Sequence, residues 1–265
     1  MRNTTPFFAG FHRLLFGRAQ RGAAEQLLAQ KQAFEQATLC QLGKLCAPWV
    51  PTRLLEPTAR GAHSRRRLFP QGLTFWAFLS QVLSPGSPCR ETVRKVQVWY
   101  AARRLPRPDS DTGAYCRARS RLPMDTLQHI HRYTADELQR RVSSDQLWCG
   151  RRVKVVDGTG VSMPDTPKNQ RAFPQSSTQK KGCGFPLAKL VGCFCLHSGA
   201  LLHWAEGTLR VHESQLFRKL FKFFQRDDIV LTDRGLCSYV DIATLLRAGV
   251  DTCGPPRFSV GPLPR

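Results

Sequence analysis

The sequence predicts an α/β domain with a mixed β-sheet, preceded by an α-helical region. From residue 148 on, β-rich apolar segments and helical segments follow one another as strand, strand, strand, helix, strand, helix, which is the order of an α/β domain. Between residues 68 and 142 the apolar side chains instead recur at helical spacing. The chain of 265 residues is long enough for one large domain or two smaller ones with real cores.

The charge balance predicts a polyanionic partner. The formal net charge is +21, from 40 Lys and Arg against 19 Asp and Glu. A basic excess of this size on a globular chain points first to nucleic acid. No apolar run approaches the length that spans a bilayer, so a membrane partner is not expected. The N-terminus has no secretory apolar region followed by a small-residue cleavage site, which predicts a cytoplasmic protein.

The cysteines are expected to be reduced and buried. There are ten of them, scattered along the chain, and no C-x-x-C motif occurs. Cys193, Cys195 and His197 stand at alternate positions, so a zinc site is one interpretation. We favour packing on one face of a strand, because no fourth ligand stands at a suitable spacing.

Residues 1–67 form a basic, partly helical N-terminal segment. Helical candidates cover residues 1–30 and 32–45, and a basic stretch follows them. Its sharpest feature is the triplet Arg65, Arg66 and Arg67. Two interpretations of this triplet remain: it lies in a solvated loop, or it contacts the DNA backbone.

Residues 68–147 are expected to form a helical module that contacts DNA. A strongly buried helix, capped by Thr74, is predicted over residues 72–83 and ends at a Ser-Pro-Gly-Ser-Pro stretch. Further helices are predicted over residues 89–102, 113–123 and 124–141. Arg117 and Arg119 lie on the third of these four helices and are candidate DNA contacts.

Residues 148–251 hold the predicted sheet. Strands are expected at residues 152–157, 187–196, 201–207 and 228–232, with helices over residues 214–224 and 239–248. The glycines at positions 158 and 160 are expected to break the first strand. A polar loop over residues 159–184 carries Lys180 and Lys181, candidate contacts to the DNA backbone. Residues 252–265 read as an irregular tail with four prolines.

Two of the predicted strands end in aspartate. Asp157 follows the first strand and Asp233 follows the fourth, with Arg234 next to it as a possible phosphate contact. Each aspartate alone is more commonly a turn residue. If the strands are neighbours, however, the two carboxylates meet and can hold Mg²⁺ or Mn²⁺ through hard oxygen ligands. Such ions activate the attacking oxygen and stabilise the leaving oxygen of a phosphodiester.

Several motifs together resemble the DDE transposases of bacterial insertion sequences, specifically the insertion-sequence-four group. They occur in the family's order at residues 75–83, 112–119, 157–159, 162–170, 184–188 and 231–234. The resemblance, which covers residues 65–251, implies an RNase H-like catalytic fold and divalent-metal cutting and joining of transposon ends in double-stranded DNA. It also implies a homodimer, with Asp157 and Asp233 as the first two acids. Their separation of 233 − 157 = 76 residues suits the family.

One departure from the family is expected to matter. The third acid of these enzymes is a glutamate on a later helix, and neither Glu206, Glu213 nor Asp165 stands in that position. We therefore expect an incomplete, C-terminally truncated catalytic domain that is inactive, or a catalytically dead DNA-binding remnant. A stand-alone metal nuclease fits the carboxylates but not the motifs. If residues 252–265 come from a shifted frame, the encoding DNA should continue the family's signature in another frame.

Overall fold

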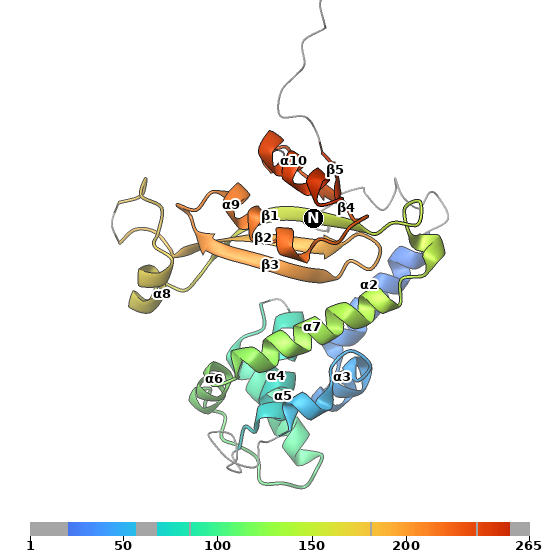
Figure 1. The fold of residues 1–265 in the computed structure, drawn as a ribbon. Helices are drawn as coiled ribbons and strands as arrows, with labels where there is room; N and C mark the ends of the chain where they lie inside the picture. The colour runs from blue at the N-terminus through green and yellow to red at the C-terminus, as the bar shows by residue number, and fades with distance from the viewer. Residues whose placement is uncertain (1–20, 57–67, 85, 181, 237, 255–265) are drawn as a thin grey trace, which may run out of the picture. The chain divides into compact units, whose positions relative to one another are not determined.

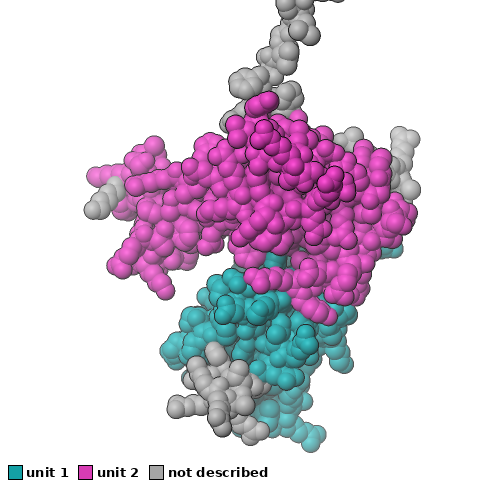
Figure 2. Space-filling model, viewed as in Figure 1, with its two compact units in different colours: residues 1–131 teal, residues 132–265 magenta. Residues whose placement is uncertain are grey.

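The computed structural model describes residues 21–56, 68–84, 86–180, 182–236 and 238–254. The chain forms two compact units, residues 1–131 and residues 132–265 (Figure 2). The division falls inside helix α7 (Met124–Arg140), whereas the sequence places it at residue 147. The boundary between the units falls in this continuous helix because Ala135 and Leu138 pack into the core of the second unit, whereas Ile130 belongs to the core of the first.

The first unit is helical, as predicted, and is organised around α4 (Gln71–Leu83). The other helices are α2 (Arg21–Gln36), α3 (Leu39–Cys46), α5 (Cys89–Ala101) and α6 (Gly113–Ser120), with a 3₁₀ turn at Thr52–Leu55. All of them contribute to two apolar clusters that α4 joins, α2 through Phe34. Leu73 and Ala77 belong to one cluster and Phe75 to the other, because α4 is apolar on more than one side.

Two helix starts in this unit differ from the sequence-based expectation. The first helix continues to Gln36, and the next begins after Thr38, whose hydroxyl accepts the Gln41 N–H while the Gln41 side chain accepts the Thr38 N–H. This capping box starts a new helix at Leu39, although the apolar spacing over residues 32–45 predicts one continuous helix. Thr74 does not cap α4, which begins after Pro70. Its hydroxyl instead donates to the Pro70 carbonyl at 2.8 Å, inside the first turn.

The second unit contains a five-stranded mixed sheet in the order β3-β2-β1-β4-β5. The strands are β1 (Val153–Ser162), β2 (Leu187–Cys195), β3 (Leu201–Thr208), β4 (Ile229–Thr232) and β5 (Asp251–Cys253). The first three pair antiparallel, whereas β4 lies parallel to both β1 and β5. With its helices this is an RNase H-like α/β fold, which confirms the predicted fold class.

One face of this sheet is covered by α9 (Glu213–Arg218) and α10 (Tyr239–Arg247), which lie on the same side in Figure 1. Val156, Val191 and Cys193 of the sheet pack there with Phe217 and Leu245 of the helices. Alternate residues of a strand share a face, so the next residue of each strand points the other way. The short α8 (Pro167–Ala172) lies in the loop between β1 and β2.

Three features of the second unit correct the sequence reading. Glycines do not end β1, because the antiparallel ladder with β2 continues through Gly158 and Gly160 to Ser162. The helix expected over residues 214–224 ends at Arg218, and a 3₁₀ turn then brings Phe221 against Phe217, with ring centroids 4.9 Å apart.

The third correction is β5. Thr252 and Cys253 pair in parallel with Val230 and Leu231 although the tail has no strand pattern of its own, because the free edge of β4 supplies the hydrogen-bond partners.

The sheet also buries an ion pair that the sequence analysis did not recognise. The Lys154 ammonium of β1 lies 2.6 Å from the Asp228 carboxylate, and both side chains are almost fully buried. Lys154 also donates to the Phe223 carbonyl at 2.9 Å, and Asp228 accepts the Gln225 N–H at 2.7 Å. These bonds supply the partners without which two buried charges are costly.

The cysteines only partly follow the prediction. Those of the described ranges are free thiols. Cys46, Cys193 and Cys195 are buried as expected, whereas Cys149 and Cys183 are exposed. In the described parts of the chain, no helix is long and apolar enough to cross a membrane.

Candidate active site

The two predicted acids stand next to each other at one end of a strand pair. In the parallel pairing of β1 and β4, Val156 is opposite Thr232. Asp157 and Asp233 are the residues that follow these two. β1 itself continues to Ser162, so Asp157 lies within the strand, directly after the point where its pairing with β4 ends. Because paired strands lie about 4.8 Å apart, Asp157 and Asp233 occupy neighbouring positions. The expectation that these two strands are adjacent is confirmed.

Asp157 is half-buried and points away from the helix-covered face of the sheet, because Val156 points into it. One carboxylate oxygen accepts the Gly158 N–H at 2.8 Å, which orients the group. Its partner on β2 is Gly192. The Phe194 ring closes over that glycine, 2.8 Å from the place where a Cβ would stand.

Asp233 begins a tight turn after β4. Its carboxylate accepts the Leu236 N–H at 3.1 Å, a side-chain bond that is typical of aspartate in turns. Leu236 is buried in the core, so it anchors the far end of the turn while Asp233 stays exposed. The arrangement holds a negatively charged, water-accessible group at the end of a short strand.

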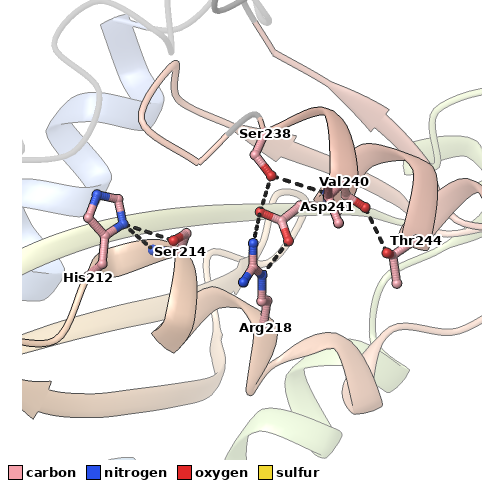
Figure 3. Close-up of polar contacts among 7 residues, drawn as sticks. All are labelled: His212, Ser214, Arg218, Ser238, Val240, Asp241 and Thr244. Carbon is pink, nitrogen blue, oxygen red and sulfur yellow. Dashed lines mark hydrogen bonds and ion pairs between the residues drawn. The ribbon is translucent and has the colours of Figure 1, made fainter.

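A polar cluster fixes the helix that follows this turn (Figure 3). Asp241 is 1% exposed, and its carboxylate accepts the Arg218 Nε–H at 2.6 Å and the Ser238 hydroxyl. Its own N–H donates to the Ser238 oxygen, which caps α10. The hydrogen bond and charge of Asp241 raise the pKa of Arg218. This cluster was not predicted from the sequence, although a serine three residues before an acid is a capping signal.

Removal of the Asp241 carboxylate is expected to destabilise the second unit. Asp241→Ala leaves Ser238 and Arg218 without their partner, and bonds to a charged group contribute about 1.5–3 kcal/mol each. We therefore expect the free energy of unfolding, measured by urea denaturation, to fall by at least about 1.5 kcal/mol. Thr244→Ala on the exposed side of the same helix is the control and should change it by less than about 0.5 kcal/mol. Equal effects of the two substitutions would contradict the assignment.

The other acids near the sheet lie in different surroundings. Glu213 approaches Gly158 from the helix-covered side, its carboxyl carbon 3.1 Å from where a Cβ would stand. Asp165 accepts the Gln170 amide at 2.9 Å in the β1–β2 loop, and Glu206 is exposed on β3. Among the residues that the structure describes, no group of three or more His, Cys, Asp or Glu side chains could hold a metal ion.

The predicted DNA contacts fall into three sets. Lys180, Arg234 and Arg117 are exposed. Arg119 is half-buried and donates to the Gln81 side chain at 3.1 Å, so part of its hydrogen-bonding capacity is used inside the helical unit. The remaining candidates, Arg65, Arg66, Arg67 and Lys181, lie outside the described residues.

Fold and site together define an RNase H-like domain with two aspartates directly after the point where the pairing of two parallel strands ends. Residues 148–262 match the family model described as a transposase DDE domain. Over these residues the chain is similar to the DDE transposases of insertion sequences. The match continues to residue 262, whereas the resemblance found in the sequence covers residues 65–251.

Two curated relatives come from Escherichia coli K12. "Transposase InsG for insertion sequence element IS4" is 26% identical over 200 residues, which are 76% of this chain and 44% of the relative. "Putative transposase InsZ" is 23% identical over 219 residues, which are 78% of this chain and 68% of the relative. The chain thus spans less than half of the length of InsG.

Proposed function

We propose that the domain acts on double-stranded DNA at the ends of a mobile element, and that Asp157 and Asp233 hold the divalent metal ion of a phosphodiester-transfer site. The observation that carries the proposal is the β1–β4 pairing, which makes these two residues neighbours at the point where the parallel ladder ends. Carboxylate oxygens are the ligands that Mg²⁺ and Mn²⁺ take up, usually one or two from the protein with water and phosphate oxygens completing the shell.

The residues around the pair suit such a centre. The backbone N–H groups of Gly158 and Leu236 each occupy one carboxylate oxygen, which orients the groups and leaves acceptor capacity for a cation. When bound, a divalent ion activates the attacking oxygen and stabilises the leaving oxygen of the phosphodiester.

In this proposal the basic side chains hold the substrate. Arg234 follows Asp233 directly, and exposed Lys180 lies in the loop between β1 and β2. Neutralisation of phosphates by such groups supplies most sequence-independent affinity for DNA and weakens as salt rises. Action as a homodimer on paired ends, in the bacterial cytosol where the element's DNA lies, belongs to the same proposal.

A second function, DNA binding without cleavage, is favoured by one observation. Within the described ranges, no group of three or more His, Cys, Asp or Glu side chains could hold a metal ion. Stabilisation of the charge that develops in the transition state is worth several kcal/mol, and a centre with only two carboxylates lacks part of it. Cleavage would therefore be lost, whereas the binding of DNA by the basic side chains would remain.

One experiment separates the two functions. The full chain is incubated with Mn²⁺ and labelled DNA that carries the element's ends, and nicking and binding are followed on denaturing and native gels. Nicking that disappears in Asp157→Ala and in Asp233→Ala but persists in Glu206→Gln supports phosphodiester transfer. Binding of DNA without nicks supports the second function. A chain that neither binds nor cuts DNA contradicts both.

A further inference from the structure

Two cysteines from different helices meet in the first unit, outside the site described above. Cys89 is the first residue of α5 and Cys116 lies in α6. Their sulfur atoms are 3.8 Å apart, and the Cys116 thiol donates to the Cys89 sulfur. Both side chains are half-buried, so a small solute in water can reach them.

Gln81 of α4 organises the polar groups around this pair. Its amide nitrogen donates to the Cys89 sulfur at 3.5 Å and to the Ser87 carbonyl at 3.2 Å. Its amide oxygen accepts the Tyr115 hydroxyl at 2.7 Å and the Arg119 guanidinium at 3.1 Å. The Cys89 thiol therefore has a hydrogen-bond donor in Gln81 and a nearby positive charge in Arg119.

The two thiols differ in acidity. Burial raises the pKa of Cys89, but hydrogen bonds from Gln81 and Cys116 and the charge of Arg119 outweigh burial, so the pKa lies below its ordinary value. Burial and the hydrogen bond to Cys89 raise the pKa of Cys116. The position of Cys89 at the start of a helix favours its thiolate further. The pair thus combines a thiolate with a neighbouring thiol, the arrangement that redox-active cysteines use.

We propose that Cys89 and Cys116 form a modification site for hydrogen peroxide, which converts them into a disulfide between α5 and α6. The Cys89 thiolate attacks one peroxide oxygen, the O–O bond breaks, and hydroxide leaves and takes up a proton as water. Cys89 is now a sulfenic acid. The Cys116 sulfur then attacks the Cys89 sulfur, the S–O bond breaks, and the hydroxyl leaves as water with the Cys116 proton. Two thiols are oxidised by two electrons, and one peroxide is reduced to two waters.

The geometry permits the second step with little movement. A disulfide brings its sulfurs to about 2.05 Å, so they must approach by roughly 1.8 Å, a distance that side-chain rotation supplies when the backbones are already close. Both helices contact α4 in the same apolar cluster, which holds them in place. The bond would replace the thiolate beside Arg119 and thereby change the surroundings of one of the predicted DNA contacts.

Peptide mapping of the full chain tests the proposal. The reduced protein is treated with a small excess of hydrogen peroxide, remaining thiols are alkylated, and a digest without reductant is analysed by mass spectrometry. We expect the Cys89–Cys116 peptide pair to form at least about tenfold faster than any other disulfide, because among the described cysteines thiolate character and proximity coincide only at this pair. The exposed Cys149, Cys183 and Cys253 serve as internal references and should remain alkylated thiols.

Three further measurements keep the result interpretable. Cys116→Ser should leave a sulfenic acid at Cys89 that dimedone traps, and Arg119→Gln should slow the oxidation of Cys89. The same treatment in concentrated urea should lose the preference for this pair, since the helices no longer hold the sulfurs together. A native chain that forms the Cys89–Cys116 bond no faster than the urea-unfolded chain, or that oxidises first at the exposed cysteines, would overturn the proposal.

Discussion

Asp157→Asn is expected to weaken Mn²⁺ binding to the full chain by at least about tenfold, and Asp233→Asn to do the same, because even groups that only support a ligand change metal affinity by about 10–100-fold. Asparagine has the volume of aspartate and keeps one oxygen to accept the Gly158 or Leu236 N–H. The substitution therefore removes the negative charge while retaining the local hydrogen bond. Calorimetric titration with Mn²⁺ measures the affinity without any need for strand cleavage.

The control for this experiment is another exposed acid of the same unit. Asp165→Asn lies in the β1–β2 loop, where its carboxylate accepts the Gln170 amide, and should leave the affinity unchanged. Thermal unfolding of each variant shows whether the fold is retained. If Asp165→Asn weakens binding as much as Asp157→Asn does, the ion is held by the general negative charge of the surface and the proposed centre is wrong.

Lys154→Met is expected to be the most destabilising substitution in the second unit. It leaves the Asp228 carboxylate buried beside an apolar side chain, and breaking a buried ion pair from one side costs about 3–5 kcal/mol. Because Lys154 lies in β1, three residues before Asp157, hydrogen exchange of the β1 amides should report the loss directly. We expect those amides to exchange at least about a hundredfold faster than in the unchanged chain.

Two companion variants separate charge from packing. In the double variant Lys154→Met with Asp228→Asn, the amide oxygen still accepts the Gln225 N–H but the buried charge is gone, so most of the protection should return. Lys222→Met changes an exposed lysine of the neighbouring turn and should alter stability by less than about 0.5 kcal/mol. No recovery in the double variant would mean that Lys154 acts through its aliphatic stem rather than through its charge.

The order of elements and the candidate acids could be read from local patterns. Residues 153–156 are rich in β-branched side chains, residues 229–232 repeat that character, and each run ends in aspartate. The periodicity of α5 and α10 is equally local. Such signals depend on neighbours a few positions away in the chain, which is why they need no knowledge of the fold.

The wrong predictions of strand bounds share one cause: the residues that pair with these strands are distant in the sequence. Gly158 remains in a strand because β2 pairs with it, and residues 252–253 become a strand because the edge of β4 is available. Neither effect leaves a pattern in the residues themselves. β-structure is more sensitive to such context than helices are, because its hydrogen bonds join separate segments.

For the candidate site, too, the sequence predicts the residue types, whereas the folded chain decides which residues meet. The sequence sufficed to select Asp157 and Asp233 as candidate acids, because strand, carboxylate and glycine succeed one another within a few residues. It did not show that β1 continues beyond Asp157. Their adjacency, the pairing of Lys154 with Asp228 and the contact of Cys89 with Cys116 required the folded chain. Each of these joins residues that are far apart in the sequence, and burial and packing, which bring such residues together, are properties of the tertiary structure.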